Sequence, residues 1–228
     1  MTIKPQPSAS PFHFQTSQPR ELLACVEFAA QQADLVGHDP GAWRWLSISM
    51  VLAVQNACLC ALDFDDEHGT KGMRHADARI IARWTKSGRK TPPPFPLREP
   101  RIVSPLELLE RVGDHRFLRP PFQLPLTRKM REDFDALVDL RNTFLHFSED
   151  GWTVDLREFP PLILTASGVI RHLAVTQPAY LRNAERGHQG RVSSALDHIE
   201  AAMDHYLDSA PPDEPEESAE GWDPLDES

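Results

Sequence analysis

Apolar side chains occupy almost every side of the helix that the sequence predicts between Asp39 and Leu62. Asp39 and Pro40 are typical of a helix start, because aspartate caps free N–H groups and proline fits the first turn. One face carries Trp43, Leu46, Met50, Ala53, Val54 and Ala57, and another carries Trp45, Ile48 and Leu52. A helix that is apolar nearly all round is surrounded by other elements. The sequence therefore predicts a bundle with this segment as its central helix.

Apolar periodicity, together with proline and glycine at the segment ends, predicts the other helices. They cover residues 19–37, 76–86, 104–112, 129–147, 160–173 and 191–208. Residues 152–156 are expected to be short and extended, and no internal repeat is found. The predicted fold class is all-α, an antiparallel helical bundle with long, proline-rich connections.

The chain divides by composition into one domain and two appendages. Residues 1–18 are rich in Pro, Ser and Gln and are predicted to be disordered, residues 19–210 form the helical domain with an insertion at 63–103, and residues 211–228 form an acidic tail predicted to be disordered. The tail holds eight acids and no Lys or Arg, so residues 1–210 carry only −2 of the net charge of −10.

Within the insertion, residues 71–101 form a basic segment with nine Lys or Arg against two acids. The candidate RNA-binding residues are Arg79, Arg83, Lys86, Arg89 and Lys90. Such cations contact phosphates, and Trp84 offers a ring for base stacking. The alternative is a solvated loop whose charge is balanced by the acids at 63–67 or by the tail.

Three cysteines, Cys25, Cys58 and Cys60, sit inside apolar helical patterns, which predicts reduced core thiols and a cytoplasmic protein. Neither the cysteines nor the pairs His68/His75 and His198/His205 match a strong zinc pattern, so no metal or cofactor is expected and these histidines are predicted to lie on the surface. No apolar run is expected to reach the length of a bilayer span, and no signal segment opens the chain. Sequence motifs of P-loop nucleotide hydrolases, zinc proteases and nucleophile-elbow hydrolases are absent.

The stretch from Arg141 to His146 interrupts the apolar pattern of its predicted helix. It lies late in a predicted amphipathic helix whose apolar stripe is Met130, Phe134, Leu137, Val138 and Leu145. Arg141 interrupts this stripe, and a guanidinium there needs a partner or a polar cavity because unpaired burial is costly. Breaks of this kind tend to mark functional sites.

The spacing of the polar residues limits how they can act together. Asn142 and His146 are four apart, so they share a helix face and the amide can orient the imidazole. Arg141 and His146 are five apart, which separates them by about 140° around a regular helix. One chain therefore cannot easily close both around one atom, whereas two copies related by a two-fold axis could.

These residues resemble the Rx4-6H motif of the HEPN superfamily, in which the Arg is commonly followed by Asn, Asp or His, as Asn142 follows here. The likeness is dense over residues 128–175 and looser over the two N-terminal helices. It implies a helical homodimer with two motifs in one cleft. Many members cut RNA without a metal, some as toxins or phage-defence components, and others only bind a nucleotide or a partner protein.

On the leading hypothesis the chain is a metal-independent endoribonuclease. His146 is the general acid and base, Arg141 binds the phosphate and Asn142 orients His146. The alternative is a purely structural role. Arg141 then pairs with Asp135, Asp139 or Glu149, and Asn142 and His146 stabilise the turn that follows the helix.

Two other functions stay open, a non-catalytic nucleotide- or partner-binding module and a plain helical scaffold. An antitoxin or regulatory protein is a further possible partner. In HEPN toxins neutralised by a nucleotidyltransferase, a Tyr commonly follows two residues after the His, and here Ser148 stands in that place. That style of neutralisation is therefore not expected.

Overall fold

The computed structural model describes residues 16–63, 70–86, 101–145, 153–177 and 185–209. Within these ranges the regular structure is helical, without a strand, and a single antiparallel β-bridge joins Met73 to Ile102. The predicted all-α class is therefore confirmed.

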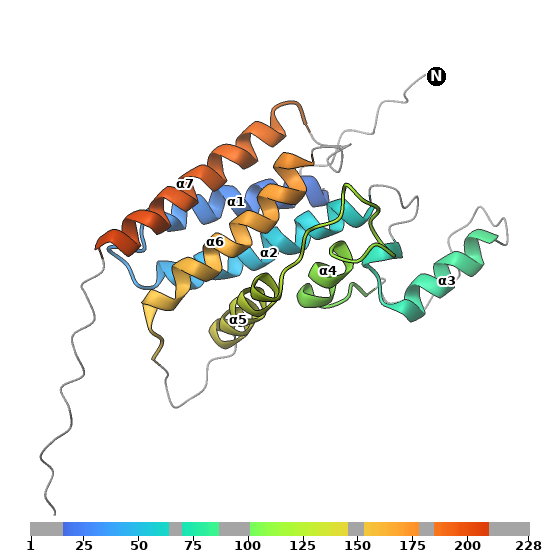
Figure 1. Ribbon diagram of the computed structural model, residues 1–228, viewed down its shortest axis with the longest axis horizontal. Coiled ribbons are helices and arrows are strands. Elements are labelled where there is room, and N and C mark those ends of the chain that lie inside the picture. The colour runs from blue at the N-terminus through green and yellow to red at the C-terminus, as the bar shows by residue number, and fades with distance from the viewer. Residues whose placement is uncertain (1–15, 64–69, 87–100, 146–152, 178–184, 210–228) are drawn as a thin grey trace, which may run out of the picture.

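Four helices form a bundle in which each lies against two others (Figure 1). They are α1 (Gln18–Ala33), α2 (Ala42–Asp63), α6 (Phe159–Ile170) and α7 (His188–Ser209). α1 packs on α2 and α7, and α6 packs on the same two helices. Side chains from all four therefore meet in a common core, as expected for a bundle.

Two further helices cover α2 on the side away from α7 (Figure 1). α5 (Arg128–Leu145) packs on α2 and α6, and α4 (Pro105–Val112) packs on α2 and α5. Ser104 caps α4 by accepting a hydrogen bond from the backbone N–H of Glu107 at 3.2 Å. This is the helix start that the Ser-Pro pair predicts.

The central position of α2 is confirmed, but one of its apolar faces remains open. Trp43, Leu46 and Met50 are fully buried, whereas Trp45 and Leu52 are 47% and 42% exposed. A single chain therefore leaves part of this helix uncovered.

Two stretches, Ala42–Asp63 and Leu156–Thr176, are long and apolar enough to cross a membrane. The expectation that no apolar run reaches this length is therefore wrong. In Ala42–Asp63, 72% of the most apolar 18-residue window is buried inside the protein, and in Leu156–Thr176 the corresponding share is 50%. A core helix of a bundle passes the same test, and α2 is such a helix.

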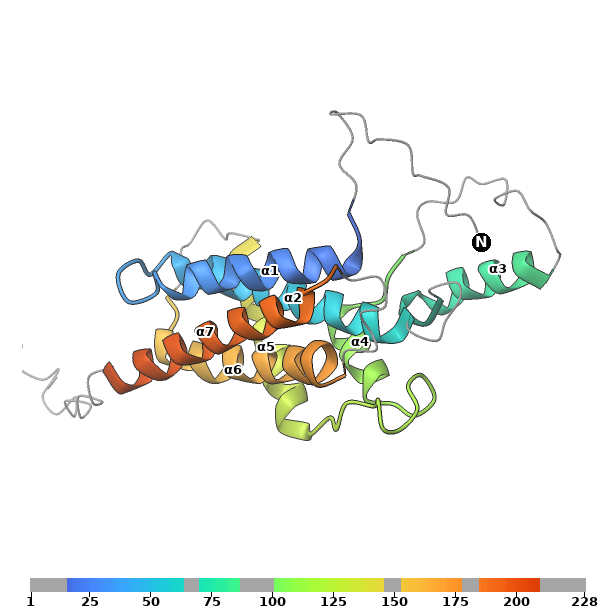
Figure 2. The same ribbon diagram turned by 90° about the horizontal axis from the view of Figure 1, so that it is seen from above.

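α3 (His75–Lys86) forms an arm that projects from the end of the bundle (Figures 1 and 2). The predicted helix at 76–86 is thus confirmed. The arm is fastened at its base, where the backbone N–H of Val103 donates to the carbonyl of Gly72 at 3.1 Å. Gly72 is tightly placed, because a Cβ there would lie 2.6 Å from a methyl carbon of Leu59.

Several helix boundaries differ from those expected. α1 ends at Ala33, because the next residues form turns. α7 begins at His188, directly after Gly187 with φ of 85°, so Gly190 lies inside the helix. A 3-10 turn, η2 (Leu156–Glu158), begins at Leu156, the last residue of the segment that was expected to be extended. α6 continues into a π-helical stretch, η3 (Arg171–Thr176), that was not predicted. The segments predicted to be disordered, apart from residues 16–18, lie outside the described residues.

Candidate functional site

Arg141 lies on the face of α5 that packs into the protein. The hydroxyl of Thr127 caps this helix by accepting a hydrogen bond from the backbone N–H of Met130 at 3.1 Å. The inward face carries the buried side chains of Phe134, Leu137 and Phe144. Arg141 follows Leu137 by four residues and precedes Phe144 by three, so it shares their face.

The apolar stripe ends on a different residue from the one predicted. Phe144 is 7% exposed and its ring lies 6.1 Å from that of Phe159 on α6, whereas Leu145 is 47% exposed. Phe144 therefore anchors the end of α5. Leu145 points outward just before the segment that holds His146.

Arg141 is half-buried, and no acid neutralises it among the described residues. Its Nε is shielded from solvent and has no hydrogen-bond partner there. Asp135 and Asp139 are exposed and form no ion pair with it, as their positions around the helix require. Glu149, the third proposed partner, lies outside the described residues. A guanidinium held in this way retains its attraction for an external anion.

The rest of the motif is only partly described. Asn142 is half-buried, and no hydrogen bond of its amide occurs within the described ranges. His146 lies outside them, so its contact with Asn142 and its distance from Arg141 stay predictions.

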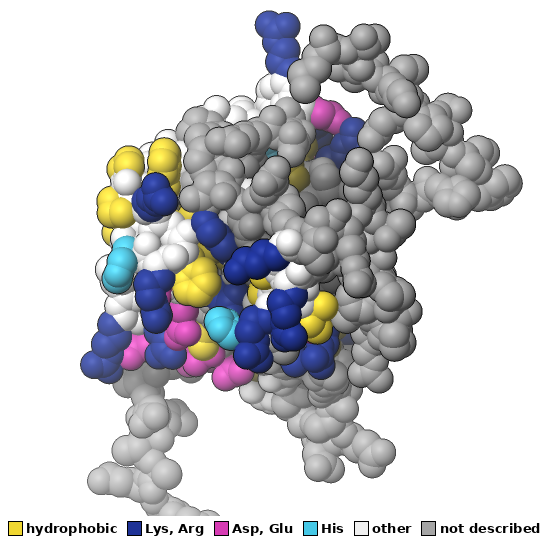
Figure 3. All heavy atoms as spheres, turned by 90° about the vertical axis from the view of Figure 1, so that its right-hand side faces the viewer, with side chains coloured by type: hydrophobic (Ala, Val, Ile, Leu, Met, Phe, Trp, Pro, Cys, Tyr) yellow, Lys and Arg dark blue, Asp and Glu magenta, His cyan; other side chains and the backbone are white. Residues whose placement is uncertain are grey.

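Arg79, Arg83 and Lys86 are exposed on α3, and the described residues offer none of them an ion-pair partner. Lys and Arg side chains gather on this end of the molecule (Figure 3). Asp77, the acid of this helix, instead binds Arg101, whose backbone N–H donates to it at 3.1 Å. Arg89 and Lys90 lie outside the described residues.

The arm and the motif do not form one cleft within a chain. α3 projects from one end of the molecule, whereas α5 lies across the middle of α2 (Figures 1 and 2). An RNA that contacts both must therefore span this separation or bridge two copies.

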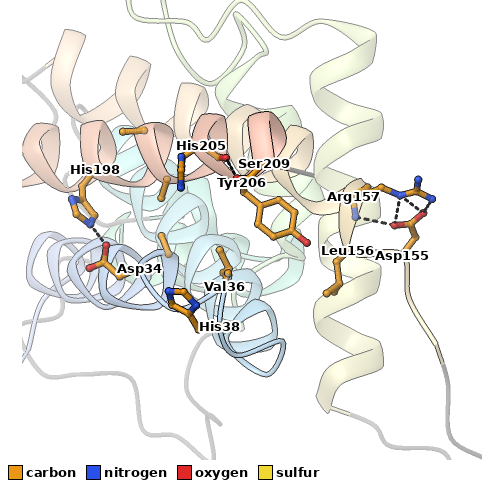
Figure 4. Close-up of a pocket in the computed structure, with 14 residues that line it drawn as sticks. Asp34, Val36, His38, Asp155, Leu156, Arg157, His198, His205, Tyr206 and Ser209 are labelled. Atoms are coloured by element: carbon orange, nitrogen blue, oxygen red, sulfur yellow. Dashed lines mark hydrogen bonds and ion pairs between the residues drawn. The ribbon is translucent and has the colours of Figure 1, made fainter. Parts of the chain in front are cut away.

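A cavity of about 790 Å³ that the sequence did not predict lies between the C-terminal halves of α1 and α7, the α1–α2 loop and η2 (Figure 4). His38, His198 and His205 line it, and His198 and His205 are exposed, so the expectation that they lie on the surface is confirmed. The Nε2 atom of His198 lies 2.6 Å from Oδ1 of Asp34. The seven-residue spacing of the α7 histidines, with Ala201 and Ala202 between them, is the sequence signal that could have indicated this hollow.

Opposite the histidines, Asp155 and Arg157 of η2 form an ion pair at 2.6 Å. Hydrogen bonds from Arg157 hold the pKa of Asp155 at about 2, so this carboxylate stays ionised and its charge is compensated. Asp34 is the other carboxylate of the lining.

Other titratable groups are kept neutral by the core. Burial, with a smaller contribution from the charge of Glu21, raises the pKa of the Cys25 thiol to about 11. Burial also raises the pKa of Cys60 to about 12 and that of Cys58 still further. These thiols are free and Cys58 and Cys60 are buried, as predicted. Across the described residues, no group of three or more His, Cys, Asp or Glu side chains is placed to hold a metal ion.

The chain matches no protein-family model, no curated protein and no solved structure with which it was compared. The likeness to HEPN proteins therefore rests on the spacing of Arg141, Asn142 and His146 and on the all-helical architecture.

Proposed function

We propose that this chain is a HEPN-like, metal-independent endoribonuclease that acts as a homodimer in the cytoplasm. The observation that carries the proposal is the state of Arg141, whose Nε is shielded and without a hydrogen-bond partner in the described part of the chain. A cation at an inward-facing position stabilises the fold less than an apolar side chain would. A phosphodiester would supply the anion that the described residues do not.

The proposed reaction uses two copies of the motif. His146 of one copy takes the proton from a ribose 2′-hydroxyl, whose oxygen attacks the neighbouring phosphorus. Arg141 neutralises the negative charge that develops on the phosphorane oxygens. His146 of the other copy gives a proton to the leaving 5′-oxygen. The products are a 2′,3′-cyclic phosphate and a 5′-hydroxyl, and Asn142 keeps the imidazole oriented.

Exposed apolar side chains support a dimer. Leu145 at the end of α5 and Trp45 on α2, two helices that pack together, are each 47% exposed. If the helix continued regularly to His146, Arg141 and His146 would be about 140° apart around it, which favours a second copy in the site. Light scattering at micromolar concentration should show a dimer, and a monomer would contradict this arrangement.

The arm supplies the proposed RNA-binding surface. Arg79, Arg83 and Lys86 extend from the bundle without acidic partners among the described residues, and Arg89 and Lys90 continue the basic segment in sequence. Contacts of this kind are to phosphates, so binding should weaken steeply as salt rises.

The test compares purified wild type, His146→Ala and the control His115→Ala on end-labelled single-stranded RNA in EDTA. His115 is suited to the control because its side chain is 79% exposed and distant in sequence from the motif. Wild type and control should cut the RNA and leave a cyclic phosphate, detected by mass spectrometry. His146→Ala should lose about 100-fold or more of the rate, as expected for an acid–base group.

Strict dependence of cleavage on Mg²⁺ or Zn²⁺, or full activity of His146→Ala, would overturn the mechanism. RNA binding without cleavage by wild type would instead favour the non-catalytic binding module. Expression of both proteins in cells, scored by growth and RNA integrity, tests the toxin or phage-defence setting.

A further inference from the structure

The cavity between α1, α7 and η2 is separate from the residues of the proposed nuclease. Its walls are largely apolar, from Ala33, Val36, Leu156, Ala201 and Ala202. Its volume of about 790 Å³ lies in the range of small-molecule sites. The ring of Tyr206 forms a further wall and is held in place by an edge contact with Trp43, with centroids 4.9 Å apart.

Negative charge predominates among the groups that line the cavity. Asp34 accepts from His198 through Oδ1, and no hydrogen bond within the described residues uses its Oδ2. Asp155 is compensated by Arg157, so Asp34 is the uncompensated carboxylate when the histidines are neutral. α1 ends at Ala33 and α7 ends at Ser209, and both ends border the cavity. Each contributes the partial negative charge of a helix C-terminus.

We propose that this cavity binds a small organic amine that is cationic at neutral pH. The ammonium group would lie near Oδ2 of Asp34 and the C-terminal end of α1, where the potential is negative. The apolar body would lie against Leu156 and Ala202 and extend toward the ring of Tyr206. Figure 4 shows Asp34 and Tyr206 on opposite sides of the His205 side chain.

Three ligands with one indole body and different head groups test this directly by isothermal titration calorimetry on the full chain. They are tryptamine, which is cationic, tryptophol, which is neutral, and indole-3-acetate, which is anionic. We expect tryptamine to bind about three- to tenfold more tightly than tryptophol, as for a partly exposed ion pair, and indole-3-acetate to bind most weakly. Equal or tighter binding of the anion, or no binding of any of the three at millimolar concentration, overturns the proposal.

Substitutions test the contribution of the Asp34 charge and that of the cavity volume separately. Asp34→Asn should weaken tryptamine by about three- to tenfold and leave tryptophol unchanged. Asp204→Asn is the matched control, because Asp204 is an exposed acid of α7 that does not line the cavity. Ala201→Trp should fill the hollow and block both ligands while the melting temperature is retained. Undiminished binding to a folded Ala201→Trp protein would show that the ligand binds elsewhere, and would overturn the assignment of the amine to this cavity.

Discussion

Arg141 occupies a position at which an apolar residue would pack better. It continues the inward stripe of Leu137 and Phe144, yet its shielded Nε has no hydrogen bond in the described structure. Unmet polar groups of this kind cost on the order of 1–3 kcal/mol. The proposed phosphate contact would offset this cost when RNA is bound.

Arg141→Leu should therefore separate stability from activity. Leucine extends the stripe and removes the unmet polar group, so the free energy of unfolding should stay level or rise by about 1 kcal/mol. RNA cleavage should fall to background, and Arg141→Lys should restore little because lysine lacks the bidentate geometry. Urea unfolding and the RNA assay measure the two effects. A marked loss of stability in Arg141→Leu would favour the structural role.

The buried thiols predict how stability depends on alkaline pH. Folding raises the pKa of Cys25 to about 11 and of Cys60 to about 12, through burial first, whereas the unfolded thiols titrate near 8.5. The folded state then holds more protons than the unfolded state above about pH 8.5, so stability falls as pH rises. We expect urea midpoints to drop from about pH 8 to about pH 10. The double variant Cys25→Ala/Cys60→Ala should show a shallower drop, and an identical one would contradict this origin.

At the scale of the elements, one arginine joins the end of α6 to α7. Arg171, at the start of η3, donates to Glu200 at 2.8 Å and to Asp197 at 2.7 Å. Glu200 also accepts from the buried hydroxyl of Ser167 at 2.5 Å. Partial burial acts to lower the pKa of Arg171, but these hydrogen bonds outweigh it and raise the pKa above its usual value. The guanidinium thus stays charged between the two helices.

Arg171→Ala should destabilise the bundle by about 1–3 kcal/mol, because Glu200 and Asp197 lose their charged partner and Glu200 is partly buried. The matched control is Arg116→Ala, which removes an arginine that pairs with Asp114 in an exposed turn. It should change the urea midpoint little. Equal effects of the two substitutions would show that the α6–α7 network adds nothing beyond a surface ion pair.

At the scale of the whole molecule, the basic arm and the C-terminal end of α7 lie at opposite ends. α7 ends at Ser209 on the side away from α3 (Figures 1 and 2). Residues 211–228, which follow in the sequence, could span at most about 60 Å if fully extended. We therefore expect the tail to be a weak competitor for RNA rather than a fixed cover.

Deletion of residues 211–228 should leave the melting temperature nearly unchanged, because the segment has few apolar residues to offset ordering entropy. RNA binding should tighten modestly at low salt and not at high salt, since eight acids compete with phosphates for the arm. Thermal unfolding and fluorescence anisotropy test both statements. A drop of many degrees in melting temperature would mean that the tail packs on the domain.

Much of the local structure followed from the sequence, because it depends on neighbours within a few residues. Periodicity identified α2 as the central helix, and the caps Thr127 and Ser104 lie where their side chains predict. The inward register of Arg141 was also predictable from spacing. Boundaries were less predictable, since the π-helical η3 and the early start of α7 depend on packing between helices.

The sequence by itself determined which segments are helices, where the unusual arginine lies on its helix and how charge is distributed along the chain. Only the tertiary structure decided that α3 projects as an arm, that Trp45 stays uncovered and that Asp34 meets His198 across 164 residues. Helix formation is governed by hydrogen bonds and side chains within about four residues. The cavity, by contrast, forms where α7, the end of α1 and η2 come together, and that meeting of segments far apart in the chain depends on the tertiary packing.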